Sequence, residues 1–370
     1  MIGGKTWRLA GGLLALAIGS AYIYTSTILS PAVKQSMLLH RQILSDAAPS
    51  PYAYRLLAPW GLEGLLKVVT ALGVPADKGF LVAEGLWATL GIWCSLAVLS
   101  WALGRRYGNL GIACATAVGV FSMNMALRDH YYQPWSLIEP AIFALAYEWI
   151  QRDRFKSLIA LVVIGTFNRE TTCFVVLLYA LYWWYSGSKY IFKVGVLSVT
   201  WLFVFSAIRL IIGPRPFVHD FSAVVNYNVS VGALVHTSVA WMMFLGPFWY
   251  CLFRGVGTLD RRSKQAMLSL VAFGSIFVFE GCWWETRPWM SFYCIVLPPM
   301  CIMLNQFVLQ SATTYESGTL SVFCSGDGTS SGAQTTQSRA HQSSVFHTPA
   351  DARSAAVDHQ ISTTAAERTT

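Results

Sequence analysis

Charged residues are scarce in this 370-residue sequence: Asp, Glu, Lys and Arg make up 12% of it, whereas hydrophobic residues make up 55%. An ordinary soluble domain carries about twice that share of charge. The apolar residues form several runs of about 17 to 25 residues, the length that a helix needs to cross a bilayer. The composition therefore excludes a soluble globular protein and predicts an all-α fold, a polytopic bundle of transmembrane helices.

The sequence also lacks the cysteine patterns of a disulfide framework or a zinc site. None of its eight cysteines forms a CxxC pair or lies near a histidine at ligand spacing, and seven lie in or beside apolar runs. Cysteines in that setting are most simply small packing residues. Neither a disulfide framework nor a structural zinc site is predicted.

No basic tract interleaved with aromatic residues is present, although the formal net charge is +8. Most of the basic residues fall in short loops between apolar runs, which is the distribution that sets membrane topology. We interpret the positive charge in that way. The expected partner is the lipid bilayer, and no nucleic-acid partner is predicted.

Residues 1–310 are predicted to form one multi-pass membrane domain with about ten short or full spans. The spans are residues 9–29, 79–103, 107–127, 134–150, 157–167, 171–186, 191–212, 237–253, 265–280 and 288–309. Residues 30–78 form an outward loop, in which the apolar spacing of residues 61–72 predicts a helix along the membrane surface. Residues 311–370 are rich in Ser and Thr and are expected to be a disordered cytoplasmic tail.

The apolar run from residue 157 to residue 186 is interrupted by Asn168-Arg169-Glu170-Thr171. A charge at the centre of a transmembrane helix costs roughly 2.5 to 3.5 kcal/mol, so such charges usually face a bundle interior or a water-filled cavity. A single crossing would place Lys189 and Lys193 outside, whereas two short segments keep them on the cytoplasmic side. The basic residues therefore favour a broken central helix pair, with non-helical backbone at the cavity.

Three groups of residues together resemble the multi-spanning membrane glycosyltransferases of the GT-C type. The first is Asp46 followed by Tyr54-Arg55-Leu56-Leu57-Ala58-Pro59, and the second is the Asn168–Thr171 break. The third is Glu285-Thr286-Arg287 leading into Leu297-Pro298-Pro299. The resemblance consists of short matches spread over residues 1–310.

This resemblance implies transfer of a sugar from a polyprenyl- or dolichyl-phosphate donor on the non-cytoplasmic face. Asp46 corresponds by position to the acid that serves such proteins as catalytic base or metal ligand. Arg55, Arg169 and Arg287 are the candidates for holding the donor phosphate, because a guanidinium fork matches phosphate geometry. The membrane would be the plasma membrane or the endoplasmic reticulum.

Many GT-C proteins carry two neighbouring acids in the first outward loop, whereas Asp46 stands alone. A second acid would come from Asp129, Glu170 or Glu285. Asp129 and His130 could also ligate a divalent metal together with another carboxylate. A short polar loop that caps two helices needs no metal, however, and no other cofactor is predicted.

Each candidate has a structural alternative. Asp46 could be a solvated turn residue, because Asp is common in turns. Arg169 and Glu170 could form an ion pair that fixes a helix break. Glu285 and Arg287 could form an ion pair at the membrane interface. Two other functions therefore stay open. One is a transporter or lipid flippase with a charged site at the midplane, and the other is a non-catalytic subunit of a membrane complex.

Overall fold

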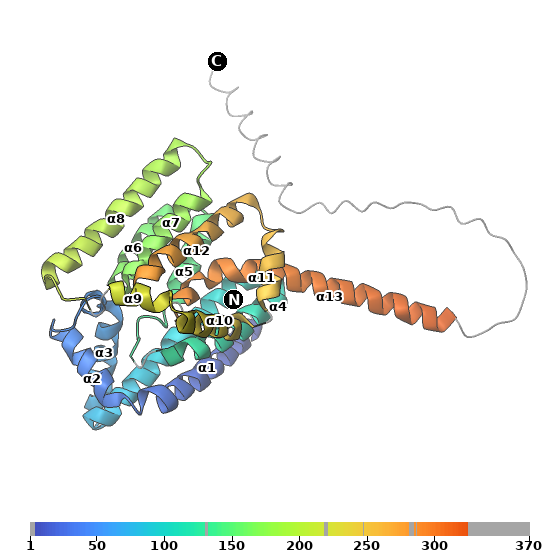
Figure 1. The fold of residues 1–370 in the computed structure, drawn as a ribbon. Coiled ribbons are helices and arrows are strands. Elements are labelled where there is room, and N and C mark those ends of the chain that lie inside the picture. Colours follow the sequence, from blue (N-terminus) through green and yellow to red (C-terminus); the bar gives the residue numbers. More distant parts are fainter. Residues whose placement is uncertain are drawn as a thin grey trace, which may run out of the picture. The chain divides into compact units, whose positions relative to one another are not determined.

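The computed structural model describes residues 4–129, 132–217, 221–246, 248–280, 285 and 287–324, and the regular elements in these residues are all helices (Figure 1). The isolated bridge between Ser50 and Phe217 is the sole β-type pairing in the described chain. The all-α prediction is confirmed. The chain divides into two compact units, residues 1–314 and 315–370. Of the second unit, residues 315–324 are described, and they are helical.

Four segments are long and apolar enough to cross a membrane, judged by length and composition. They are Trp7–Leu29, Lys78–Ala126, Ser188–Ile212 and Arg287–Val308. Shorter apolar helices accompany them, and large apolar side chains such as Leu210 and Ile211 are more than four-fifths exposed, at 83% and 84%. Lipid chains can cover such surface, so the fold is compatible with an integral membrane protein.

Helix α1 (Gly4–Tyr24) continues into a π-helical turn at Thr25–Leu29 and packs along α4. The expected outward loop, residues 30–78, contains two helices, α2 (Val33–Leu44) and α3 (Leu57–Ala71). Between them lies a short 3-10 turn, Tyr52–Tyr54. Helix α3 corresponds to the helix predicted at residues 61–72, but it begins earlier, at Leu57.

Helix α4 (Ala76–Ala126) is a hairpin of two helices that turn at Gly108, whose φ of 59° and ψ of −142° are not helical. The two arms correspond to the predicted segments 79–103 and 107–127. They approach closely, because a Cβ at Gly119 would lie 2.8 Å from the Leu96 side chain. Glycine thus permits both the turn and the packing of the arms.

The break in the central run is confirmed. Helix α6 (Phe155–Asn168) is followed by Arg169, whose backbone is extended. A 3-10 turn at Glu170–Thr172 then leads into α7 (Cys173–Tyr182). The chain then enters α8 (Ser188–Ile212). Its Lys193 pairs with Asp153, which lies two residues before the start of α6, at 2.6 Å from Nζ to Oδ2. Helices α6 and α7 therefore run out and back, so that Lys193 returns to the end at which α6 began.

Helix α5 (Glu139–Gln151) lies at the centre of this arrangement. It packs against α4, α6, α7 and the 3-10 helix Arg287–Phe292, and most of its residues are buried. Its first residue, Glu139, is a buried acid beside the α6–α7 break. Helix α5 thus supplies a carboxylate next to the charged residues of the break.

The described helices that follow α8 are α9 (Phe221–Asn228), α10 (Val231–Leu245), α11 (Phe248–Val256), α12 (Arg261–Glu280) and α13 (Tyr293–Cys324). The predicted single segment 237–253 falls on two helices, α10 and α11. The cause is Gly246, whose positive φ of 52° ends α10. Helix α13 continues past residue 311, where a tail was expected to begin, as far as Cys324. The rest of that expected tail, residues 325–370, lies outside the described residues.

We expect Gly255→Ala to destabilise the protein, because a Cβ at this position of α11 would overlap the backbone of Pro299 in α13. Overpacking of this kind typically costs about 1–3 kcal/mol. The measurement is thermal unfolding in detergent. Gly195→Ala on α8 is the matched control, since no atom lies within 4 Å of the added carbon. Equal unfolding temperatures for the two variants would contradict the packing of α11 against α13.

Candidate functional site

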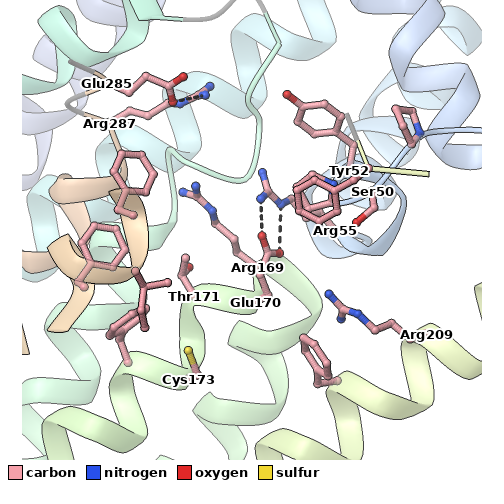
Figure 2. Close-up of a pocket in the computed structure, with 18 of the residues that line it drawn as sticks. Ser50, Tyr52, Arg55, Arg169, Glu170, Thr171, Cys173, Arg209, Glu285 and Arg287 are labelled. Carbon is pink, nitrogen blue, oxygen red and sulfur yellow. Dashed lines mark hydrogen bonds and ion pairs between the residues drawn. The ribbon is translucent and has the colours of Figure 1, made fainter. Parts of the chain in front are cut away.

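A cavity of about 660 Å³ lies where the α6–α7 break meets the first loop and the segment before α13 (Figure 2). Charged residues and large apolar residues both line it. The charged residues are Arg55, Arg169, Glu170, Arg209, Glu285 and Arg287. The large apolar residues come from α7, α8, α12 and the chain before α9, and they are Phe174, Trp201, Phe205, Phe217, Phe273 and Phe277.

Arg55 joins the first loop to the helix break. Its guanidinium donates two hydrogen bonds to the Glu170 carboxylate, one of them from Nε to Oε2 at 3.2 Å. The same guanidinium lies over two rings, 5.1 Å from the centroid of Trp135 and 5.6 Å from that of Tyr52. The bidentate geometry and the stacking hold Arg55 in one orientation.

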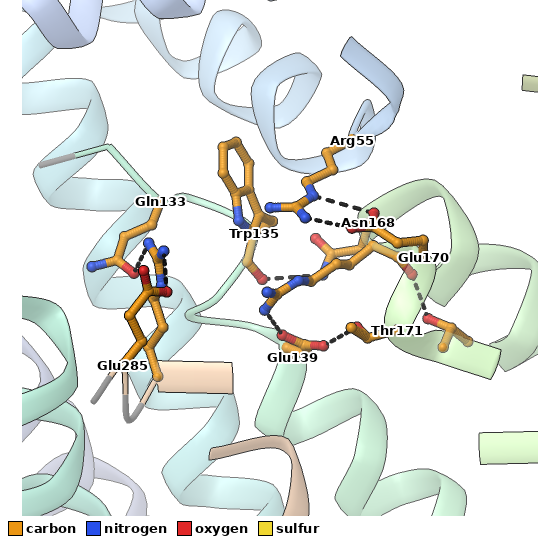
Figure 3. A network of polar contacts seen from close by, with 11 residues as sticks. Arg55, Gln133, Trp135, Glu139, Asn168, Glu170, Thr171 and Glu285 are labelled. Atoms are coloured by element: carbon orange, nitrogen blue, oxygen red, sulfur yellow. Dashed lines mark hydrogen bonds and ion pairs between the residues drawn. The ribbon is translucent and has the colours of Figure 1, made fainter. Parts of the chain in front are cut away.

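Arg169 is held from the opposite direction, by α5 (Figure 3). Its Nη1 donates to Glu139 Oε2 at 2.7 Å, and the Thr171 hydroxyl donates to the other oxygen of the same carboxylate. Asn168 Nδ2 donates to the Trp135 carbonyl at 3.0 Å. These contacts satisfy many of the polar groups that the end of α6 brings to this depth, which helps to stabilise the break.

Arg287 forms the third cationic group. It donates to Glu285 Oε2 at 2.8 Å and to Gln133 Oε1 at 3.1 Å. Gln133 in turn donates to the Leu127 carbonyl at 3.2 Å, so the segment before α13 is tied to the loop that follows α4. The Glu285 Oε1 atom has no hydrogen bond to the residues that the structure describes.

Arg209, near the end of α8, is a fourth arginine at this cavity. Its guanidinium carbon lies 3.4 Å from the ring centroid of Phe205 and 4.3 Å from that of Tyr54. Four arginines and two glutamates therefore line the cavity. This excess of positive charge, focused by apolar walls, favours an anionic ligand.

Some buried N–H groups of cavity-lining residues have no acceptor in the described part of the chain. They include Nε of Arg169, a residue only 6% exposed, and Nε1 of Trp201. A buried donor without an acceptor costs roughly 1–3 kcal/mol. A ligand rich in acceptor oxygens would relieve that cost.

The structure brings together five of the seven residues that the sequence singled out. Arg55, Arg169, Glu170, Glu285 and Arg287 all line the one cavity, as a shared role of the three arginines in holding one phosphate would require.

Asp46 lies apart from these five. It sits on the exposed turn after α2, with a positive φ of 53°, and it does not line the cavity. Asp129 ends the 3-10 turn Leu127–Asp129, but its side chain and all of His130 lie outside the described residues. The catalytic role of Asp46 and the supporting roles of the other acids stay predictions.

Among the described residues, no group of three or more His, Cys, Asp and Glu could hold a metal ion. The proposed ligand pair Asp129 and His130 falls outside that search. The two acids beside the helix break form ion pairs with arginines: Glu170 pairs with Arg55, and Glu139 pairs with Arg169.

The sequence reasoning missed Glu139, Gln133, Trp135 and Arg209. Glu139 and Arg209 carried a usable signal, because each is a charged residue inside a predicted span, as Arg169 is. Gln133 and Trp135 carried none, because a polar loop beside aromatic residues is common at membrane interfaces.

A buried histidine supports the loop that holds Gln133 and Trp135. His40 Nδ1 lies 2.7 Å from the Tyr132 hydroxyl, and Nε2 lies 3.2 Å from Glu63 Oε2. Burial lowers the pKa of His40, more than the hydrogen bond to Glu63 raises it. This network ties α2 and α3 to residues 132–138, whose Trp135 ring packs on Arg55.

No protein-family model matches the chain, and neither the curated proteins nor the solved structures yield a match. The fold and the site by themselves define its class, an all-α protein compatible with membrane insertion that contains a cationic cavity.

We expect Glu139→Gln to destabilise the protein strongly, because it leaves the buried Arg169 charge without its carboxylate. Breaking one partner of a buried pair typically costs about 3–5 kcal/mol. Thermal and denaturant unfolding in detergent measure the effect. The double variant Glu139→Gln, Arg169→Gln should recover much of the loss. Additive effects of the two single changes would show that the pair is not coupled.

Proposed function

We propose that this protein is an integral membrane glycosyltransferase, whose cavity binds the phosphate of a polyprenyl- or dolichyl-linked sugar. The observation that carries the proposal is the meeting of Arg55, Arg169 and Arg287, from three distant segments, in one cavity with an aromatic wall. Guanidinium groups suit the phosphate, and the apolar wall suits the first units of a lipid chain. The resemblance to GT-C proteins, carried by these same segments, points to the same ligand.

The position of the cavity in the bundle supports a reaction on the non-cytoplasmic face. Helix α8 has Lys189 near its start and Arg209, at the cavity, near its end. Twenty residues of helix separate the two by about 30 Å, the thickness of the hydrocarbon core. The basic loops Arg105-Arg106 and Arg152-Asp153-Arg154 contact each other through Glu148, at the end where α8 begins. By the positive-inside rule that end would face the cytoplasm, and the cavity, at the other end of α8, would then face the opposite side of the membrane.

The proposed chemistry is a displacement at the anomeric carbon of the bound sugar. The bond from this carbon to the phosphate oxygen breaks, a bond to the acceptor oxygen forms, and the acceptor proton passes to a carboxylate. The lipid phosphate leaves with the additional negative charge, which the arginines stabilise.

Two carboxylates are candidates for the base. Glu285 lines the cavity and has one oxygen without a described hydrogen bond, whereas Asp46 is the acid that the resemblance implies. Glu170 is less suited, because both of its oxygens accept from Arg55.

A second function, a non-catalytic subunit that holds a phospholipid or lipid-linked sugar without transferring it, is favoured by one observation. Each carboxylate at the cavity forms an ion pair with an arginine in the structure. A transporter is less well supported, since the charged groups gather at one end of the helices and a transported substrate needs access from both ends.

We expect a polyprenyl phosphate to raise the unfolding temperature of the purified protein, and the uncharged polyprenol to do so far less. Arg287→Gln should weaken this binding by about tenfold or more, because a hydrogen bond to a charged group is lost. Arg128→Gln is the control, since Arg128 is an exposed arginine on the turn beyond the cavity end of α4. Equal effects of phosphate and alcohol, or of the two variants, would contradict the phosphate site.

Transfer itself is tested with radiolabelled polyprenyl-phosphate sugars, by release of the sugar to water or to added acceptors. We expect Glu285→Gln to lower the rate by about 10²–10⁴, the range for loss of a general base. Asp46→Asn should leave the rate nearly unchanged if Glu285 is the base, and should lower it by that factor if Asp46 is. If the unchanged protein and every variant bind the donor but release no sugar from it, the non-catalytic subunit is favoured.

A further inference from the structure

A second cavity, of about 410 Å³, lies at the other end of α7 and α12 from the first. Helix α7 begins with Cys173 at the first cavity and ends at Tyr182 at the second, and α12 runs between them in the opposite direction. The second cavity is lined by the turn after α7 and the first residues of α12, namely Tyr182, Tyr185, Ser186, Asp260, Arg261, Arg262 and Gln265.

Two arginines of this cavity pack on aromatic rings and not on carboxylates. The guanidinium carbon of Arg261 lies 3.9 Å from the Tyr185 ring centroid, and that of Arg262 lies 4.3 Å from the Trp183 ring centroid. No ion pair in the described part of the chain includes either residue. Stacking orients a guanidinium and leaves its N–H edge available to an anion.

Asp260, the acid within the second cavity, forms no ion pair with either arginine. Asp260 accepts hydrogen bonds through Oδ2 from the backbone amides of Arg262 and Ser263, at 3.1 and 3.3 Å. At the same end of the helices, Arg106 and Arg152 share Glu148, and Lys193 pairs with Asp153. The second cavity therefore holds two cations that, unlike these three residues, form no ion pair in the described part of the chain.

The surroundings indicate a membrane interface. Trp184 and Tyr185 of the same turn are 67% and 66% exposed, and Ile191 and Phe192, one turn into α8, are 74% and 72% exposed. Large aromatic and apolar side chains exposed beside a basic cavity are typical of the level at which lipid head groups lie. An anion that reaches the cavity from this side carries acyl chains that can cover the apolar residues.

We propose that the second cavity binds the phosphate of an anionic phospholipid head group, with Arg261 and Arg262 as the phosphate ligands and the Tyr182–Ser186 turn as its wall. This site is separate from the proposed sugar-donor site and does not depend on it. The lipid would fix the turn between α7 and α8 against the start of α12, and thereby brace the two helices that line both cavities.

The test measures the unfolding temperature of the purified full-length protein in mixed micelles with increasing phosphatidylglycerol, against phosphatidylcholine. We expect the anionic lipid to stabilise the protein. The variant Arg261→Gln, Arg262→Gln should need about tenfold or more lipid for the same shift. Arg261→Lys, Arg262→Lys keeps the charge but loses the fork, and should fall between the two.

The matched control is Arg154→Gln, Lys156→Gln, which removes two exposed charges close to Asp153, at the same end of the helices, but outside the cavity. This control should respond to lipid as the unchanged protein does. If the control variant loses stabilisation by the anionic lipid to the same extent, the effect comes from general surface charge and the proposal is overturned. Stabilisation by inorganic phosphate at the concentrations at which lipid acts would overturn the assignment to a lipid. Circular dichroism of each variant without lipid distinguishes loss of binding from loss of folding.

Discussion

The two ion pairs at the α6–α7 break are the constraint on which the rest of the structure depends. Arg169 and Glu170 are adjacent in the chain, yet they do not neutralise each other. Each pairs with a residue from another segment, Arg169 with Glu139 and Glu170 with Arg55. A buried pair recovers its desolvation cost only with good geometry and further hydrogen bonds, which Thr171 supplies to Glu139. The break therefore fixes where α5 begins and where the first loop docks.

This exchange of partners explains why the cavity is built from distant parts of the chain. If Arg169 and Glu170 paired with each other, neither the first loop nor α5 would be needed to stabilise the break. Because each takes a partner from elsewhere, the loop that carries Arg55 and the helix that begins at Glu139 must both approach. Trp135, whose carbonyl accepts from Asn168 and whose ring lies under Arg55, then closes the arrangement between them.

The break and the meeting of the charged segments could be predicted from the sequence, because charge inside an apolar run is costly and can be read directly. The pairing could not be predicted. An acid such as Glu139 can serve any arginine within reach, and one sequence does not say which segments are neighbours. The division of residues 237–253 into α10 and α11 was also missed. It depends on the positive φ of Gly246, and glycine inside an apolar run is equally compatible with an uninterrupted span.

The position of the Asp46 side chain could not be predicted for a different reason. Position in the chain places it in the first outward loop, but the direction of a side chain depends on the local backbone. The loop turns at Asp46 with a positive φ, and residues on both sides of it, such as Gln42 and Pro49, line the cavity, whereas Asp46 does not. Glu285 reaches the cavity because Arg287 and Gln133 hold its segment against the loop after α4. In the proposed transfer a base must lie within hydrogen-bonding reach of the acceptor, so the proposal favours Glu285, which other residues position at the cavity, over Asp46.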